Sequence, residues 1–247
     1  MNNDIAIDFR NVCKNYKLYK KYNNTILTSI LFSKNVKEKI VLKDVSFQIK
    51  KGESVVIIGK NGMGKSTILK LISGITYPTS GSISVYGKLN AILELNSGFE
   101  NDLTGKENIY LKCKLLGLKT SEIKAIEDKI IDFADIGEYI DQPIRTYSTG
   151  MKSRLGFSIS INTAPEILVL DEVFSVGDHY FRQKCFEKIK EFLKDNNHTL
   201  LLVTHSIDIA REFCQRGILI ENGTIQYDGN IDECINLYLK NSTKKHD

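Results

Sequence analysis

The sequence predicts an α/β fold in which strands alternate with helices around one core, with a helical block inserted. Short apolar runs rich in β-branched residues recur along the chain, and segments with apolar residues at helical spacing stand between them. A glycine-rich octapeptide joins one such run to a helix. We therefore expect one domain over 1–247, with a core at about 1–97 and 164–247 and a helical subdomain at about 98–163.

The first fifty residues predict strands around an unusual polar segment. Apolar patterning indicates strands over Ile5–Phe9, Ile40–Val45 and Phe47–Ile49. Between them, residues 14–39 are rich in lysine and tyrosine and surround an apolar island. We interpret 14–39 as an insertion or long loop with a short helix at 25–32, which serves either as a solvated loop or as a docking element.

Residues 59–66 read Gly-Lys-Asn-Gly-Met-Gly-Lys-Ser and match the phosphate-binding pattern G-x-x-x-x-G-K-[ST]. The apolar run Ser54–Ile58 predicts a buried strand before them, and the spacing of 67–72 predicts a helix after them. This arrangement presents backbone N–H groups and the positive end of a helix dipole to an anion. We predict that Lys65 reaches the β- and γ-phosphates of a nucleotide and that the Ser66 hydroxyl binds Mg²⁺.

The remaining elements follow from turn residues, caps and apolar periodicity. Thr104 and Glu107 predict a capping box at the start of the helical block. The expected strands are Ser82–Tyr86, Asn90–Leu95, Ile167–Leu170, Thr199–Val203, Ile218–Glu221 and Thr224–Tyr227. The expected helices lie within 104–133, with a break at Gly117, and over Gly150–Thr163, Asp178–Leu193, Ser206–Cys214 and Asp232–Lys240.

Two acids, Asp171 and Glu172, follow the predicted central strand Ile167–Leu170. Ligands of open α/β sheets bind at the C-terminal ends of the strands. We predict that Asp171 holds Mg²⁺ through water and that Glu172 is the general base toward the attacking water. An acidic turn without function is the alternative, which the presence of a phosphate-binding loop disfavours.

Two further segments are candidates for phosphate contact. His205 follows the predicted strand Thr199–Val203, where an imidazole can touch the γ-phosphate. The segment Tyr147–Met151 precedes a helix with a Ser or Thr at its N-cap, and free amides, a serine hydroxyl and a helix dipole suit an anion. By itself, however, this segment is an ordinary helix start.

The composition describes an ordinary globular chain. The net charge of +4 is mild, so it does not demand a nucleic acid and suits an anionic membrane face equally well. No apolar run approaches the ~20 residues of a membrane helix, and the N-terminus lacks a basic, apolar leader, so we expect no secretory signal. Five scattered cysteines favour reduced thiols in the cytosol over disulfides or zinc.

In this order the motifs resemble the ATP-binding subunits of ABC transporters over nearly the whole chain. Gly59–Ser66 is similar to the Walker A loop, Ile167–Glu172 to Walker B, Ser148–Gly150 to the signature segment, Ser175–Asp178 to the D-loop and His205 to the switch histidine. The resemblance implies a P-loop NTPase fold with a RecA-like core, an antiparallel β subdomain and a helical subdomain. It implies ATP hydrolysis with Glu172 and His205 as catalytic residues. The nucleotide-binding residues that it implies are Tyr16, Gly59, Asn61, Gly62, Gly64, Lys65, Ser66, Thr67, Ser148, Gly150 and Asp178, and the metal-binding residues are Ser66, Asp171 and Glu94.

A narrower resemblance is to the subgroup that exports polysaccharides, namely O-antigen, capsule and wall teichoic acid. It is carried by Gly98–Asn108, Tyr147–Phe157 and Asp171–Asp178, and by Ile131–Glu138 and Asn15–Lys20, which are especially similar to the teichoic-acid exporters. The subgroup stacks adenine on an aromatic residue near the N-terminal strand, for which Tyr16 is the best match and Tyr19 or Tyr22 the alternatives.

The chain departs from the general family pattern at three positions. Thr149 replaces the first signature glycine, Met151 replaces the signature glutamine, and Glu94 is the best equivalent of the missing Q-loop glutamine. The polysaccharide subgroup shares such departures, so they favour the narrower resemblance.

The resemblance also implies partners. Two copies would form a head-to-tail dimer in which each signature segment caps the γ-phosphate held by the other copy. Two copies of a membrane-spanning permease would dock near residues 95–118, a lipid-linked glycopolymer would be the cargo, and the position would be peripheral, on the cytoplasmic face of the cell membrane.

The alternatives are the ATPase of a drug exporter or importer, and a soluble ABC ATPase that acts on DNA or the ribosome. The type that acts on DNA would need a long coiled-coil insertion between the Walker A loop and the signature segment. The roughly eighty residues there contain no sustained heptads. We therefore expect no nucleic-acid partner.

Overall fold

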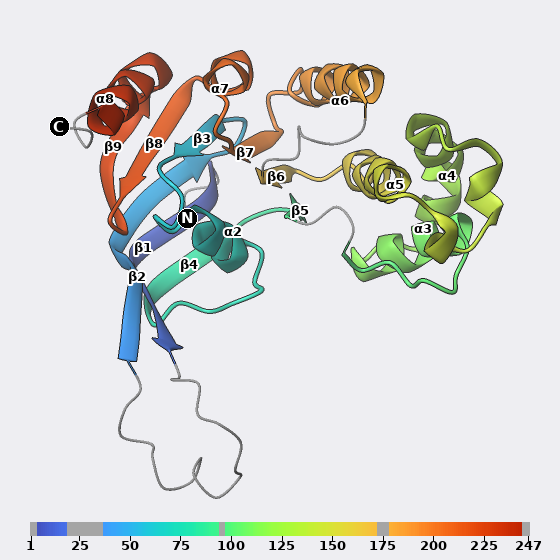
Figure 1. The fold of residues 1–247 in the computed structure, drawn as a ribbon, viewed down its shortest axis with the longest axis horizontal. Helices are drawn as coiled ribbons and strands as arrows, with labels where there is room; N and C mark the ends of the chain where they lie inside the picture. The colour runs from blue at the N-terminus through green and yellow to red at the C-terminus, as the bar shows by residue number, and fades with distance from the viewer. Residues whose placement is uncertain (1–3, 19–36, 94–96, 172–177, 244–247) are drawn as a thin grey trace, which may run out of the picture.

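The computed structural model describes residues 4–18, 37–93, 97–171 and 178–243. These ranges form two sheets and several helices (Figure 1). The smaller sheet is antiparallel and contains, in the order β2-β1-β4, the strands β1 (Ile5–Leu18), β2 (Lys37–Lys50) and β4 (Ser80–Val85). The larger sheet has the order β5-β6-β7-β3-β8-β9 and contains β3 (Ser54–Ile58), β5 (Leu89–Ile92), β6 (Ile167–Asp171), β7 (Thr199–Val203), β8 (Arg216–Glu221) and β9 (Thr224–Asn230).

Alternate residues of the larger sheet face two different hydrophobic clusters. Val56 and Leu202 belong to the cluster that includes α5 to α8, whereas Ile57 and Val203 belong to the cluster that includes α2 and the smaller sheet. The neighbouring strands β5, β6, β7, β3 and β8 are parallel to one another. Burial on both faces explains why these strands are mostly apolar. The helices concerned are α2 (Lys65–Ile72), α5 (Thr149–Asn162), α6 (His179–Phe192), α7 (Ile207–Phe213) and α8 (Ile231–Thr243).

A third hydrophobic cluster is formed by residues between Phe99 and Ile159. It joins α5 to α3 (Gly105–Leu115), α4 (Thr120–Ala134) and the 3₁₀ turns η1 (Gly137–Asp141) and η2 (Ile144–Thr146). The predicted capping box is confirmed, because Thr104 N–H donates to Glu107 Oε2 at 2.8 Å and Glu107 N–H donates to Thr104 Oγ1 at 3.2 Å. Among the described helices of the chain, none is long and apolar enough to cross a membrane.

The prediction of a loop from residue 14 onward is wrong at both of its ends. The β1–β2 pairing continues to Leu18 opposite Lys37, and the short helix expected at 25–32 lies outside the described residues. Tertiary contacts stabilise this polar extension: Asn15 N–H donates to Thr79 Oγ1 at 2.9 Å, and Lys14 Nζ donates to the Tyr77 carbonyl oxygen at 2.6 Å. Cross-strand hydrogen bonds satisfy the backbone whatever the side chains are, so polarity alone did not indicate a strand.

Candidate nucleotide-binding site

The phosphate-binding loop joins β3 to α2 and is packed against two other strands. Gly62 and Gly64 have φ angles of +79° and +105°, which residues with side chains rarely adopt. A Cβ atom on Gly64 would lie 2.7 Å from Leu42 Cδ2 of β2, and one on Gly59 would lie 2.4 Å from the Ile220 carbonyl oxygen of β8. The loop therefore requires glycine for its backbone conformation at two positions and for close approach at two.

Lys65 begins α2, and its side chain folds back into the loop. Its Nζ donates to the carbonyl oxygens of Gly59 and Lys60 at 2.7 and 3.2 Å, and the residue is only 6% exposed. Phosphate oxygens form stronger, charge-assisted hydrogen bonds with an ammonium group than carbonyl oxygens do. The enclosed ammonium and the glycine backbone therefore fit a nucleotide phosphate. Asn61 and Ser66 are exposed beside it, and Thr67 is half-buried.

The strand register brings further predicted residues to the same edge of the larger sheet. Ile57 of β3 pairs with Val203 of β7, which pairs in turn with Asp171 at the end of β6. His205 follows β7 by two residues and is exposed. The carboxyl ends of these three parallel strands thus bring together the phosphate-binding loop, Asp171 and His205, where ligands of such sheets bind.

The order of these strands was not evident from the sequence. β7 lies between β3 and β6, so the phosphate-binding loop and Asp171 are on strands that are not neighbours. Apart from Asp171 in β6 and Thr199 in β7, these two strands are apolar, and no local pattern tells which of them pairs with β3. Glu172, which follows Asp171, and Glu94, which follows β5, lie outside the described residues.

Tyr16 lies on β1 and is half-buried. Lys14 Nζ lies 5.0 Å from the centroid of its ring. The partner strand β2 carries Leu42, which touches the phosphate-binding loop, so Tyr16 belongs to the hairpin that flanks this loop. Tyr19 and Tyr22, the alternatives for adenine stacking, lie outside the described residues.

Ser148, Gly150 and Asp178 gather at a second place, where α5 begins. Ser148 Oγ accepts a hydrogen bond from Met151 N–H at 3.2 Å and so caps α5. Gly150 is open, because the nearest atom to a Cβ atom there would be Ser148 Oγ at 3.8 Å. The three residues line a pocket of about 860 Å³ together with residues 135–139, a size typical of ligand pockets, which are about 300–1,000 Å³.

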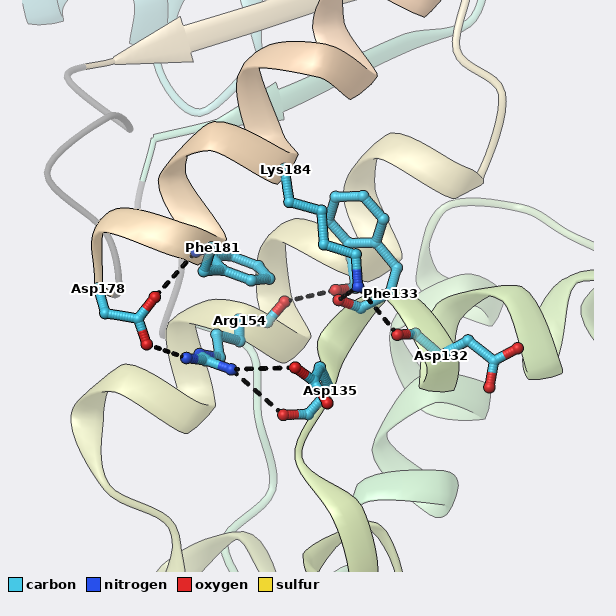
Figure 2. A network of polar contacts seen from close by, with 8 residues as sticks. Asp132, Phe133, Asp135, Arg154, Asp178, Phe181 and Lys184 are labelled. Carbon is cyan, nitrogen blue, oxygen red and sulfur yellow. Dashed lines mark hydrogen bonds and ion pairs between the residues drawn. The ribbon is translucent and has the colours of Figure 1, made fainter.

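Figure 2 shows that Asp178 is part of a network joining α4, α5 and α6. Its carboxylate accepts a hydrogen bond from Phe181 N–H at 2.8 Å, which caps α6, and forms an ion pair with Arg154. These contacts hold the pKa of Asp178 below its ordinary value, the hydrogen bond from Phe181 being the largest cause. Arg154 also packs over the Phe181 ring and donates to the Asp135 carbonyl oxygen at 3.2 Å. Sequence analysis missed this link, and the nucleotide contact of Asp178 stays a prediction.

The two groups of residues lie on different parts of the molecule. Figure 1 shows α2, which follows the phosphate-binding loop, near the middle of the view, and the helices α3, α4 and α5 on the right. The signature segment Ser148–Gly150 is at the start of α5, where the pocket includes the connection after α4. One chain therefore presents a phosphate-binding half and a separate signature half.

Two curated proteins match this chain over most of its length. An O-antigen export system ATP-binding protein of Klebsiella pneumoniae is 41% identical, with 94% of this chain and 97% of that protein covered. A teichoic acids export ATP-binding protein of Bacillus anthracis is also 41% identical over 94% of this chain, which spans only 42% of that longer protein.

The fold and the family are shown by two further comparisons. A dimeric ATP-binding cassette in a post-hydrolysis state, bound to ADP and Pi, has the same fold, with a TM-score of 0.73, 22% sequence identity, and coverage of 91% of this chain and 98% of that one. The ABC transporter family model matches residues 42–175. The chain therefore belongs to the ABC transporter family, as an ATP-binding protein with the ABC ATPase fold.

Proposed function

We propose that this chain is the ATP-hydrolysing subunit of an ABC exporter that moves a polysaccharide or a teichoic acid across the cytoplasmic membrane. The observation that carries the proposal is the similarity, over nearly the whole chain, to export subunits named for two unlike polymers. A lipid-linked glycopolymer is the class of cargo that fits both.

The phosphate-binding half has the groups that ATP hydrolysis needs. Lys65 and the backbone N–H groups of 59–66 hold the phosphates, and Tyr16 stacks on the adenine. The Ser66 hydroxyl and the Asp171 carboxylate are oxygen ligands of the kind that Mg²⁺ prefers, and Glu94 is a further candidate. When bound there, Mg²⁺ neutralises charge on the β- and γ-phosphates.

Two residues serve the chemical step in this proposal. Water attacks the γ-phosphorus while the bond to the β-phosphate oxygen breaks, and Glu172 accepts the proton of the water. His205, at the end of β7, contacts the γ-phosphate that becomes inorganic phosphate.

The separation of the two halves supports a head-to-tail dimer. Each copy would cover the phosphate-binding loop of the other with Ser148–Gly150, whose free N–H groups suit the γ-phosphate. The open surface at Gly150 and the 860 Å³ pocket leave room for the partner's nucleotide. Closure upon ATP binding would then drive the permease.

The same proposal places the chain at the cytoplasmic face of the membrane, bound to two copies of a permease. The third hydrophobic cluster supports a helical subdomain at about 98–163, since all the members of this cluster lie between Phe99 and Ile159. The permease would dock near residues 95–118. The remaining residues, at about 1–97 and 164–247, would form the core that binds nucleotide.

Loss of nucleotide binding tests the proposal in cells. A strain that carries Lys65→Ala in place of the natural chain should accumulate lipid-linked polymer inside and lose surface polymer, because the lysine holds the phosphates. Lys70→Ala, at an exposed position of the same helix, should leave export intact. Unchanged surface polymer together with a defect in drug efflux or nutrient uptake would move the chain to another branch of the family.

A further inference from the structure

The segment 97–104, which precedes α3, is held in part by the buried side chain of Asn108, in addition to hydrogen bonds from the backbone of Ile144 and Arg145. Asn108 is fully buried, and its Oδ1 accepts a hydrogen bond from Glu100 N–H at 2.8 Å. Its Nδ2 donates to the carbonyl oxygens of Glu100, Leu103 and Thr104 at 3.0, 3.1 and 2.9 Å. Asn108 ends one of the segments that carry the polysaccharide-exporter resemblance. Its role is to preorganise the loop that precedes α3.

Lys112 lies against this loop in an unusual setting for a lysine. Its Nζ is 3.9 Å from the centroid of the Phe99 ring, and a Cβ atom on Gly98 would lie 3.9 Å from its Cε. Burial lowers the pKa of Lys112 to about 8. Within the described ranges, Lys112 forms no ion pair. A partly desolvated cation on an aromatic ring attracts a carboxylate that reaches it in good geometry.

The space beside Lys112 fits a side chain better than a small ligand. Lys112 lines a pocket of about 140 Å³ with Gly98, Leu115 and Leu116. Ligand pockets are about 300–1,000 Å³, so this pocket is small for a ligand. Leu115, at its rim, is 73% exposed. This surface therefore suits a protein segment with one carboxylate and an apolar neighbour.

We propose that Lys112 binds an aspartate or glutamate of the permease, whose carboxylate enters this pocket while an adjacent apolar side chain covers Leu115. The inference rests on the proposed function for the existence of that partner and adds the chemistry by which it is recognised. A second copy of this chain is the less suitable occupant. The proposed dimer covers the start of α5, whereas the pocket lies along its later residues Gly156, Ile159 and Ser160.

Affinity for the permease in detergent tests this contact. Lys112→Met keeps most of the stem and removes the charge, and Lys112→Glu reverses it. Both should weaken binding of the chain to the purified permease at least tenfold, roughly, because the carboxylate loses its partner. Lys112→Arg should retain binding, and Lys114→Met, at an exposed position of the same helix, is the matched control. ATPase activity of the isolated chain should be unchanged in all four.

Charge exchange then identifies the partner residue. Replacing the right permease acid by lysine should restore binding of the Lys112→Glu chain. The proposal is overturned if Lys112→Met and Lys112→Glu bind as the natural chain does, or if Lys114→Met weakens binding equally. If the natural chain itself does not bind the permease, the proposed function fails first, and that result is distinct from a defect confined to Lys112.

Discussion

The phosphate-binding loop and the signature segment belong to one proposed site but are held by different forces. The loop is enclosed: Gly59 and Gly64 touch neighbouring strands, and Lys65 is buried. The signature segment is open at Gly150. Arg154, on the same helix, joins α6 through an ion pair with Asp178, whose side chain is 58% exposed, and through the Phe181 ring. Such exposed pairs contribute little to stability. The first half is therefore enclosed by the chain itself, whereas the second presents an open surface at Gly150.

Replacing Glu172 by Gln should show the largest effect, since the proposed function places the chemical step in the phosphate-binding half. We expect ATP turnover to fall about 10²-fold or more, with ATP binding retained, because the amide cannot accept the proton of the water. Steady-state ATPase and equilibrium nucleotide binding measure the two properties. Glu187→Gln, at an exposed position of α6, is the control. Near-normal turnover in the Glu172→Gln chain would remove Glu172 from this role.

A large side chain at position 148 should act on the signature half and prevent dimer formation. In the Glu172→Gln background with ATP and Mg²⁺, the chain should run as a dimer on sizing, and the further change Ser148→Arg should abolish that dimer because the side chain occupies the γ-phosphate position. Ser121→Arg adds the same side chain to an exposed position of α4 and should leave the dimer intact. If sizing shows one species with and without ATP for every variant, the shared-site arrangement fails.

Two glycine substitutions compare the halves directly. Gly64→Ala should lower the free energy of unfolding by roughly 1–3 kcal/mol, because its φ is +105° and its Cβ would lie 2.7 Å from Leu42 Cδ2. Gly150→Ala, in an open helical position, should be neutral or stabilising by up to about 1 kcal/mol. Urea unfolding measures both. Equal destabilisation by the two would contradict the contrast between an enclosed loop and an open segment.

The smallest expected effect is the loss of stability at acid pH that comes from the ion pair between Asp178 and Arg154. The pKa of Asp178 lies below the ordinary 3.8 in the folded chain, so the stabilisation is present above pH 3.8 and is lost as the pH falls through the folded-state pKa. Asp178→Asn should therefore lose slightly less stability than the natural chain between about pH 6 and about pH 3. Urea midpoints at the two pH values test this, and identical losses would exclude a contribution from Asp178.

Local signals carried most of the site prediction. Three signals depend on residues close in sequence: the octapeptide at 59–66, the acids after an apolar strand and the capping box at Thr104. The structure places the octapeptide after β3, Asp171 at the end of β6 and Thr104 at the start of α3. The extension of β1 to Leu18 was missed because its stability comes from pairing with β2 and from contacts with Thr79 and Tyr77, which are distant in sequence.

By itself the sequence determined the strand–loop–helix around Lys65 and the position of Asp171 at the end of a buried strand, since hydrophobic period and glycine conformation act locally. The family followed from the resemblance of the motifs and was shown by the comparisons. Only the tertiary structure decided that β7 separates β3 from β6, that Arg154 joins Asp178, and that Lys112 rests on Phe99. These depend on which apolar strands pair and which helices pack together. Many pairings bury similar apolar area, and the choice among them is made by the packing of the whole chain.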